Sequence, residues 1–146
     1  MPRGKDYLGD PRRTTVNRNV EDEAAAGAGA RPRCSQTTLR GMYLFADHGV
    51  DTTGNTFAGA GYEVYDGNGN IEGISSANFS GEITRNEHYS GTYIVNADCT
   101  GTSTYPGDIE YKYDLFIAPD GSMFTWVQSA PADERVVSGV EQRVTR

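Results

Sequence analysis

The sequence predicts an all-β protein, a small antiparallel β-barrel of about eight strands. From Thr37 onward, short runs of alternating apolar and polar residues are separated by turn signals such as Asp-Gly, Asn-Gly and Pro-Asp-Gly. The 18 glycines and 9 tyrosines favour strands over helices, and glycine within a strand lets a sheet bend. Because closure removes exposed sheet edges, we expect a barrel rather than an open sheet.

Length and charge restrict the class of protein. A chain of 146 residues forms one domain with one core. The net charge of −7 argues against a nucleic-acid partner, which requires a basic surface. No apolar run approaches the roughly 20 residues that cross a bilayer. The N-terminus has no apolar signal-peptide core, so we expect a cytoplasmic protein with no membrane partner.

Residues 1–33 differ in composition from the rest of the chain. They are rich in arginine and carry an acidic run followed by alanines and glycines, which indicates a short helix that Pro32 ends. We expect an N-terminal arm over residues 1–33, either disordered or acting as a lid, and a barrel domain over residues 34–146.

The segment from Gly61 to Gly81 predicts the central hairpin. Asp66-Gly67-Asn68-Gly69-Asn70 separates two extended runs, and a tight reversal needs the positive φ that Gly and Asn tolerate. The loop resembles a calcium ligand set, but the downstream glutamate of an EF-hand is missing at the required spacing, so we interpret it as a turn.

Two later segments are the clearest strands. EYKYDLFIA and SMFTWVQSA alternate regularly, with one face formed by Tyr111, Tyr113, Leu115, Ile117, Phe124, Trp126 and Gln128. The last run, ERVVSGVEQRVTR, places three valines on one face and charged residues on the other. Its valine face is the more apolar, so hydrophobic patterning alone would turn the valines inward.

The two cysteines, Cys34 and Cys99, are expected to be reduced in a cytoplasmic protein. In a secreted barrel they would form a disulfide, which is the alternative. The chain has two histidines and no ligand pair at metal-site spacing, so we expect no metal and no cofactor. Asp47 and His48 stand where a strand meets a loop, and we interpret them as exposed polar residues rather than an acid–base pair.

Two stretches resemble a known family. VYDGNGNIEGISSANF and SGVEQRVT are similar to segments of allene-oxide-cyclase-like barrels, which have a lipocalin-like shape. Within that superfamily they are most similar to bacterial Diels–Alder-type cyclases that form spirotetronate and spirotetramate polyketides. The resemblance implies a cofactor-free cyclase of antibiotic biosynthesis that acts on a hydrophobic small molecule.

The resemblance also implies which faces line the barrel. On the strand before the hairpin it selects Ala60, Tyr62 and Val64. On the last strand it selects the face of Gly139, Glu141, Arg143 and Thr145, against the valine pattern.

From these faces we predict the site. Gln128, Glu141 and Arg143 would orient or polarise the substrate through hydrogen bonds. An aromatic and aliphatic pocket would pack against a polyene, formed by Tyr43, Tyr62, Tyr111, Tyr113, Leu115, Ile117, Phe124 and Trp126. The alternatives are that the aromatic residues are ordinary core and that Glu141 and Arg143 are an exposed rim.

A concerted cycloaddition needs no nucleophile, which suits a sequence without a catalytic triad or phosphate loop. The predicted function is therefore an intramolecular cycloaddition of a linear polyketide. The alternative is a lipocalin-like carrier of an apolar molecule without chemistry. A homodimer is compatible with the sequence, which does not determine the oligomeric state.

Overall fold

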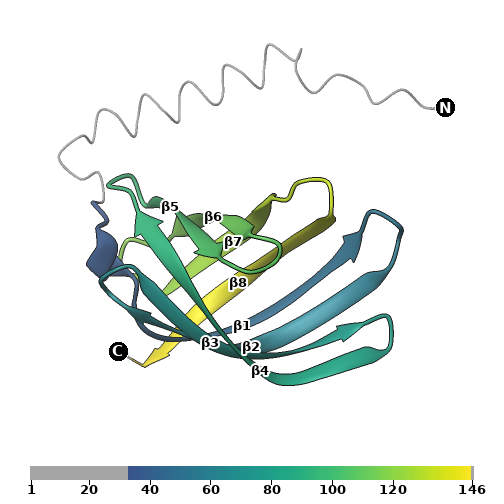
Figure 1. Ribbon diagram of the computed structural model, residues 1–146. Coiled ribbons are helices and arrows are strands. Elements are labelled where there is room, and N and C mark those ends of the chain that lie inside the picture. Colours follow the sequence, from purple (N-terminus) through teal and green to yellow (C-terminus); the bar gives the residue numbers. More distant parts are fainter. Residues whose placement is uncertain (1–32, 146) are drawn as a thin grey trace, which may run out of the picture. The chain divides into compact units, whose positions relative to one another are not determined.

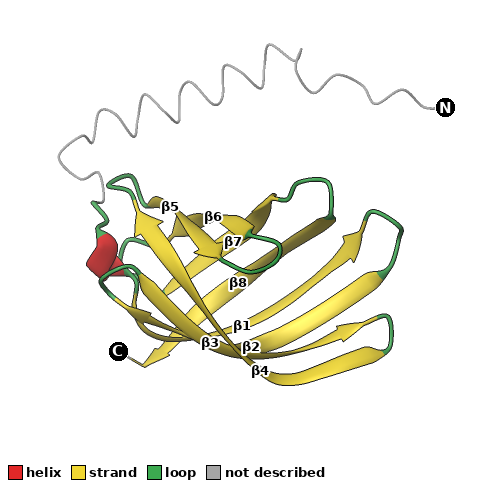
Figure 2. Cartoon of the chain, viewed as in Figure 1, coloured by secondary structure: helices red, strands yellow, loops and turns green. Residues whose placement is uncertain are grey.

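Eight antiparallel strands, each hydrogen-bonded to the next, close into a barrel in the computed structural model, which describes residues 33–145 (Figure 1). The strands are β1 (Arg40–Asp51), β2 (Thr56–Asp66), β3 (Asn70–Phe79), β4 (Glu82–Val95), β5 (Thr100–Tyr105), β6 (Tyr111–Ile117), β7 (Met123–Ala130) and β8 (Arg135–Thr145). A short 3-10 helix, η2 (Gln36–Thr38), precedes them (Figure 2). The predicted all-β barrel is confirmed. The predicted arm, helix and lid fall on residues that lie outside the described range, apart from Arg33.

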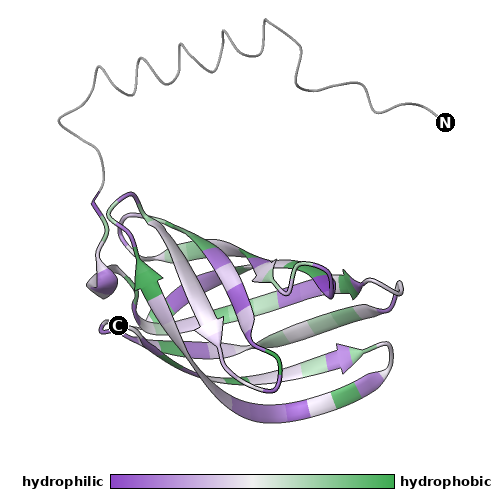
Figure 3. Ribbon diagram, turned by 45° about the horizontal axis from the view of Figure 1, so that its top comes forward, coloured by the Kyte–Doolittle hydropathy of each residue, from purple (hydrophilic) through white to green (hydrophobic). Residues whose placement is uncertain are grey.

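Buried and exposed side chains alternate along much of the sheet, as the pleat of a β-strand requires, although the first part of β4 is exposed throughout. Figure 3 shows hydrophilic and hydrophobic residues interspersed along the strands. On β6 and β7 the predicted inward face is confirmed, with Leu115 and Phe124 each 1% exposed. On β2 the prediction is wrong by one residue. Glu63 and Tyr65 are buried while Val64 is 39% exposed, so Ala60, Tyr62 and Val64 face outward.

On β8 the more apolar face lies outside. Val136 and Val140 are 69% and 48% exposed, whereas Glu141 is 4% exposed. The interior face follows the family resemblance rather than the hydrophobic pattern for Gly139, Glu141 and Arg143, although Thr145, at the end of the strand, is exposed. The glycine on that face is required because the Trp126 ring occupies the space where its side chain would be.

Glycines on the inner face lie beneath aromatic rings of the neighbouring strand. Gly73 pairs with Tyr89 across β3 and β4, and a Cβ on Gly73 would lie 2.4 Å from the Tyr89 ring. Gly139 pairs with Trp126 across β7 and β8, where the same distance is 2.5 Å. Each ring therefore fills space that a side chain on the glycine would need, and pairing of an aromatic residue with glycine is also used to stabilise designed sheets.

One end of the barrel is filled by aromatic residues. Tyr43, Tyr65 and Phe124 contact one another with ring centroids 5.2 to 5.5 Å apart, and Tyr93 contacts Tyr65. The Tyr43 hydroxyl donates to the Gly121 carbonyl, so this end is both apolar and hydrogen-bonded. We call it the closed end.

The segment before β1 covers the closed end. The Gln36 side chain donates to the Tyr93 carbonyl and accepts from the Val95 amide, while the Tyr93 hydroxyl donates to the Leu39 carbonyl. A disulfide joins Cys34 to Cys99 in the β4–β5 turn, across a sequence separation of 65. The expectation of two reduced cysteines is therefore wrong for this structure.

The strands differ in length, and the barrel wall is lower on one side. β4 has 14 residues and β5 has 6, and their ladder runs only over Thr92–Val95 on β4. Within the described residues, the first part of β4 (Glu82–Ser90) pairs with β3 and has no strand on its other edge. Figure 1 shows this part of the β3–β4 hairpin extending beyond the short strands.

Candidate functional site

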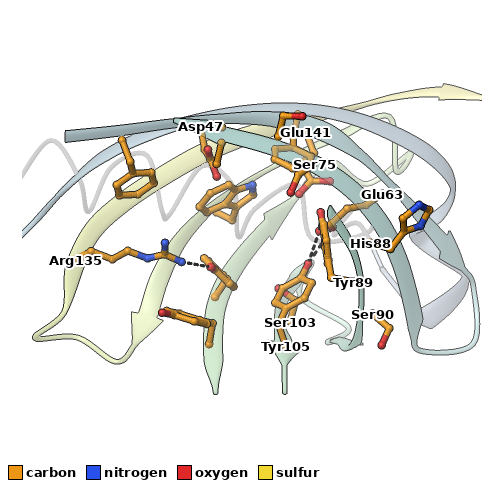
Figure 4. Close-up of a pocket in the computed structure, with 18 of the residues that line it drawn as sticks. Asp47, Glu63, Ser75, His88, Tyr89, Ser90, Ser103, Tyr105, Arg135 and Glu141 are labelled. Atoms are coloured by element: carbon orange, nitrogen blue, oxygen red, sulfur yellow. Dashed lines mark hydrogen bonds between the residues drawn. The ribbon is translucent and has the colours of Figure 1, made fainter. Parts of the chain in front are cut away.

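A cavity of about 520 Å³ lies inside the barrel, beyond the aromatic residues of the closed end. We call it the lumen, and Figure 4 shows it in close-up. Phe57, Phe79, Tyr111 and Arg135 line both the lumen and a second hollow of about 600 Å³ beside the β1–β2, β3–β4 and β7–β8 loops. The lumen therefore opens at this end of the barrel, which we call the mouth.

A buried glutamate ties three strands together at the inner end of the lumen. Glu63 of β2 accepts hydrogen bonds from the hydroxyls of Tyr65, Tyr89 and Tyr105, with O···O distances of 2.6, 2.8 and 2.8 Å. Figure 4 shows the Tyr89 and Tyr105 side chains directed at the Glu63 carboxyl. Burial raises the pKa of Glu63, and the three hydroxyl donors partly oppose that rise.

Two further carboxyl groups share this side of the lumen. Asp47 of β1 lies between β2 and β8 in the sheet, opposite Gly59 on one side and Gly139 on the other. Glu141 of β8 pairs with Phe45, two residues from Asp47 along β1. We call Asp47, Glu63 and Glu141 the acidic wall.

The ionisation of one carboxyl group in the acidic wall affects the pKa of its neighbours. Burial raises the pKa of Glu141 well above the usual glutamate value, and repulsion from Glu63 and Asp47 raises it further. Burial likewise raises the pKa of Asp47, which the Arg135 guanidinium partly lowers. The Trp126 indole N–H lies close enough to lower the pKa of Glu141 but does not reach hydrogen-bond geometry. Among residues 33–145, neither the indole nitrogen nor Glu141 Oε2 has a hydrogen-bond partner.

Aromatic side chains line the rest of the lumen and meet the acidic wall at both ends, where Tyr89 and Tyr105 donate to Glu63 and the Trp126 ring covers Gly139. Neighbouring strands contribute Tyr89, Tyr105, Tyr113 and Trp126, and each ring contacts the next edge to face with centroids 5.7, 5.5 and 5.1 Å apart. We call these four residues the aromatic wall. Such contacts hold the rings in fixed orientations, so the wall is formed before any ligand enters.

Arg135 is held at the mouth by four side chains. Its Nε donates to Gln128 Oε1 at 2.6 Å and its Nη2 donates to the Tyr113 hydroxyl at 3.1 Å. Its guanidinium lies over the rings of Tyr111 and Phe57, at 4.4 and 5.1 Å from their centroids. Arg135 thus points into the lumen as a fixed positive charge (Figure 4).

Five of the predicted site residues line the lumen: Tyr111, Tyr113, Leu115, Trp126 and Glu141. They come from β6, β7 and β8. Alternation alone predicts the interior faces of β6 and β7, whereas on β8 the resemblance and the hydrophobic pattern predict opposite faces. The structure therefore brings three of the predicted aromatic side chains and the predicted glutamate together around one cavity.

The other predicted residues lie elsewhere. Tyr62 faces outward on β2, and Tyr43, Ile117 and Phe124 are buried but do not line the lumen. Arg143 donates to the Asp120 carbonyl beside the closed end. Gln128 is buried, but it donates to the Pro131 carbonyl and accepts from Arg135. Its contact is therefore with the arginine rather than with the lumen.

Sequence reasoning missed the residues that give the lumen its charge, namely Asp47, Glu63 and Arg135. Asp47 was interpreted as exposed, whereas it lines the lumen, and the neighbouring His48 does face outward. One signal was present for β2. Gly59 and Gly61 share the parity of Glu63, and the inner face is where bending strands of a barrel place their glycines.

No cluster of three or more metal-ligating side chains occurs among residues 33–145. In the same range, no helix is long and apolar enough to span a membrane. The chemistry that this site offers comes from its carboxyl groups, hydroxyls, guanidinium and aromatic rings.

We expect the folded protein to become more stable as the pH falls from about 8 to about 5. The folded pKa values of Glu63, Glu141 and Asp47 are raised, so the folded state holds protons that the unfolded chain releases in this range. The free energy of unfolding then decreases as the pH rises from the pKa of these carboxyl groups in the unfolded chain towards their pKa in the folded state. Urea unfolding at several pH values measures this free energy.

Glu141→Gln should flatten this pH dependence, because it removes one of the coupled protons. Glu72→Gln is the matched control, since Glu72 is exposed on the outer face of β3. A wild-type urea midpoint that does not change between these pH values would contradict the assignment of raised pKa values to the acidic wall.

No family model matches the chain, and no curated protein matches it. The solved structure of EF1p2_mFAP2b bound to DFHBI is similar, at 17% sequence identity and a TM-score of 0.50, covering 79% of this chain and 100% of that chain. A redesigned beta barrel, mFAP1, also bound to DFHBI, has 19% identity and a TM-score of 0.47, covering 78% of this chain and 100% of that chain.

The EF1p2_mFAP2b likeness is one of fold. Together with the sequential order of the strands, it defines the class of this protein as a closed, lipocalin-like, up-and-down β-barrel of eight strands. The resemblance to spirotetronate and spirotetramate cyclases rests on the two sequence segments alone.

Proposed function

We propose that the lumen binds a largely apolar small molecule and that the protein is a cofactor-free cyclase. The observation that supports this most directly is the preformed lumen, with an aromatic wall on one side and ionisable groups on the other. Eight-stranded barrels can hold one small ligand in this position, and the similar structure of EF1p2_mFAP2b is bound to the small molecule DFHBI.

The proposed reaction is an intramolecular Diels–Alder-type cycloaddition of a linear polyketide polyene. The aromatic wall would fold the polyene so that diene and dienophile meet, and such positioning can supply at most about 7–11 kcal/mol. Arg135 would take the polarising role predicted for Arg143, because its guanidinium faces the lumen. Glu141 would orient the chain from the opposite side, and Gln128 would act as a positioning residue through Arg135.

Incubation with a panel of linear tetronate and tetramate polyenes tests the cyclase. We expect product to form faster than in buffer, and Arg135→Gln to lower kcat by about a hundredfold, as for loss of one preorganised donor. Glu72→Gln on the outer face should leave the rate unchanged. No acceleration with any substrate of the panel would reject the enzyme.

A carrier of an apolar molecule is the second candidate, supported by the same lumen. A carrier would bind the polyenes without converting them, and Arg135→Gln would then change affinity alone.

A homodimer would suit the outer surface. Leu44, Val140 and Val144 are each about half exposed on the adjacent strands β1 and β8, at 51%, 48% and 48%. We propose that a second copy covers this face, because apolar patches on a barrel surface favour association.

A further inference from the structure

The acidic wall and the aromatic wall together form a site suited to an organic cation. Asp47, Glu63 and Glu141 come from three adjacent strands, with β1 between β2 and β8, and all three line the lumen. The rings of the aromatic wall line the same cavity, with Tyr89 and Tyr105 hydrogen-bonded to Glu63 and Trp126 beside Glu141. Figure 4 shows Asp47 and Glu141 on one side of the cavity and Tyr105 on the other.

Acidic residues outnumber arginine and lysine residues around the lumen. Among the described residues that line it, Arg135 is the single arginine or lysine, against three carboxyl groups. Arg135 lies at the mouth, where it donates to Gln128 and Tyr113. It partly lowers the pKa of Asp47. The hydrogen bonds of Arg135 given above leave Glu63 and Glu141 without a cationic partner among residues 33–145. Burial therefore favours the protonated form of these carboxyl groups, and a bound cation would favour the ionised form.

The three carboxyl groups differ in the number of hydrogen-bond donors that already contact them. The two oxygens of Glu63 are occupied by tyrosine hydroxyls. Asp47 is flanked by Gly59 and Gly139. Its carboxyl lies over Gly59, and the Trp126 ring fills the space over Gly139. Glu141 has no tyrosine donor comparable to those of Glu63 among residues 33–145. Asp47 and Glu141 line the lumen without such donors, and the buried Glu141 Oε2 has no hydrogen-bond partner among residues 33–145, so these two carboxyl groups have acceptor capacity left for a ligand.

The opposite wall also favours a cation. The faces of tyrosine and tryptophan rings attract ammonium and guanidinium groups through the ring quadrupole. The protein already uses this interaction at the mouth, where Arg135 lies over Tyr111 and Phe57. A protonated amine in the lumen would be within reach of carboxyl groups and of aromatic rings together.

We propose that the ligand of this barrel carries a basic nitrogen that is protonated when bound, and that Asp47 and Glu141 recognise it. This inference rests on the proposed function in one respect, namely that the lumen is the ligand site. It adds a substrate class: an amine-bearing apolar chain, with any acidic oxygen of the ligand directed to Arg135 at the mouth.

Three matched probes test the charge preference: phenylbutylamine, phenylbutanol and phenylbutyrate, which are cationic, neutral and anionic at neutral pH. Trp126 is the single tryptophan of the chain and lines the lumen, so its fluorescence reports binding without a label. We expect the amine to bind at least about tenfold more tightly than the alcohol, and the carboxylate to bind most weakly.

The double variant Asp47→Asn, Glu141→Gln removes both charges with little change of shape. It should bring the ratio of amine to alcohol affinity to about one, because the carboxylates that favour the amine are gone. Glu72→Gln, which removes a charge from the outer face, should keep the wild-type preference. Circular dichroism confirms that each variant retains the barrel.

The outcomes separate the two proposals. Binding of the alcohol as tight as that of the amine, or tighter binding of the carboxylate, overturns the cation inference and leaves the lumen as a ligand site. Binding of none of the probes overturns both.

Discussion

Breaking the Cys34–Cys99 disulfide is expected to lower the free energy of unfolding by about 4 kcal/mol. The bond closes a loop with a sequence separation of 65, which includes β1 to β4. In the chain-entropy view, the bond stabilises the fold mainly by restricting the unfolded chain, and the restriction grows with the logarithm of loop length. Urea unfolding of the oxidised protein and of Cys34→Ser measures the difference.

The folded state should change little in that variant. The covering segment keeps its other contacts, which are the Gln36 hydrogen bonds, the Tyr93 hydroxyl bond and the Cys34 amide donating to the Ala97 carbonyl. Cys99→Ser and the double variant should lose the same amount as Cys34→Ser, because each breaks the same bond. Equal urea midpoints for oxidised and reduced protein would contradict the prediction.

A count of free thiols on protein isolated without reductant tests whether the Cys34–Cys99 disulfide forms in the compartment where the protein is made. Disulfides persist in oxidising compartments and are rare in the cytosol. No free thiols are expected from a barrel held by Cys34–Cys99, and two free thiols would agree with the cytoplasmic localisation that the sequence predicts.

Glu63→Ala is expected to destabilise the barrel by about 3 kcal/mol. The substitution removes the acceptor shared by Tyr65, Tyr89 and Tyr105, which come from β2, β4 and β5. A buried donor left without an acceptor loses its solvation without recovering it, and the Tyr65 hydroxyl belongs to a side chain that is 1% exposed. The relief of a buried, repelled charge offsets part of this loss.

Glu63→Gln is the matched variant. The amide keeps the shape of the side chain and one acceptor oxygen, so we expect it to lose less stability than the alanine variant. Chemical unfolding at neutral pH compares the two. If Glu63→Ala were as stable as the wild type, the desolvation cost of the carboxylate would exceed the worth of its three hydrogen bonds.

Local pattern was sufficient to predict the fold. The Asp66–Asn70 hairpin and the alternation on β6 and β7 depend on turn chemistry and pleat, which are properties of neighbouring residues. The same alternation placed Tyr113, Leu115 and Trp126 in the lumen correctly.

The polar part of the site could not be predicted in the same way. A glutamate is buried on β2 because tyrosines 26 and 42 residues further along the chain donate to it, and no local pattern contains that pairing. For the same reason, the hydrophobic pattern predicts the wrong interior face on β2 and β8. A lumen that holds ionisable groups turns Glu63 and Glu141 inward and leaves Val64 and Val140 on the outside.

The short ladder between β4 and β5 has a consequence for the size of molecule that the protein can accept. His88, Tyr89 and Ser90 line the lumen on the part of β4 where the wall has no further strand among the described residues. The lumen is therefore bordered there by a strand edge as well as by loops at the mouth. A molecule longer than the lumen could leave one portion outside, so overall length would not determine which molecules enter.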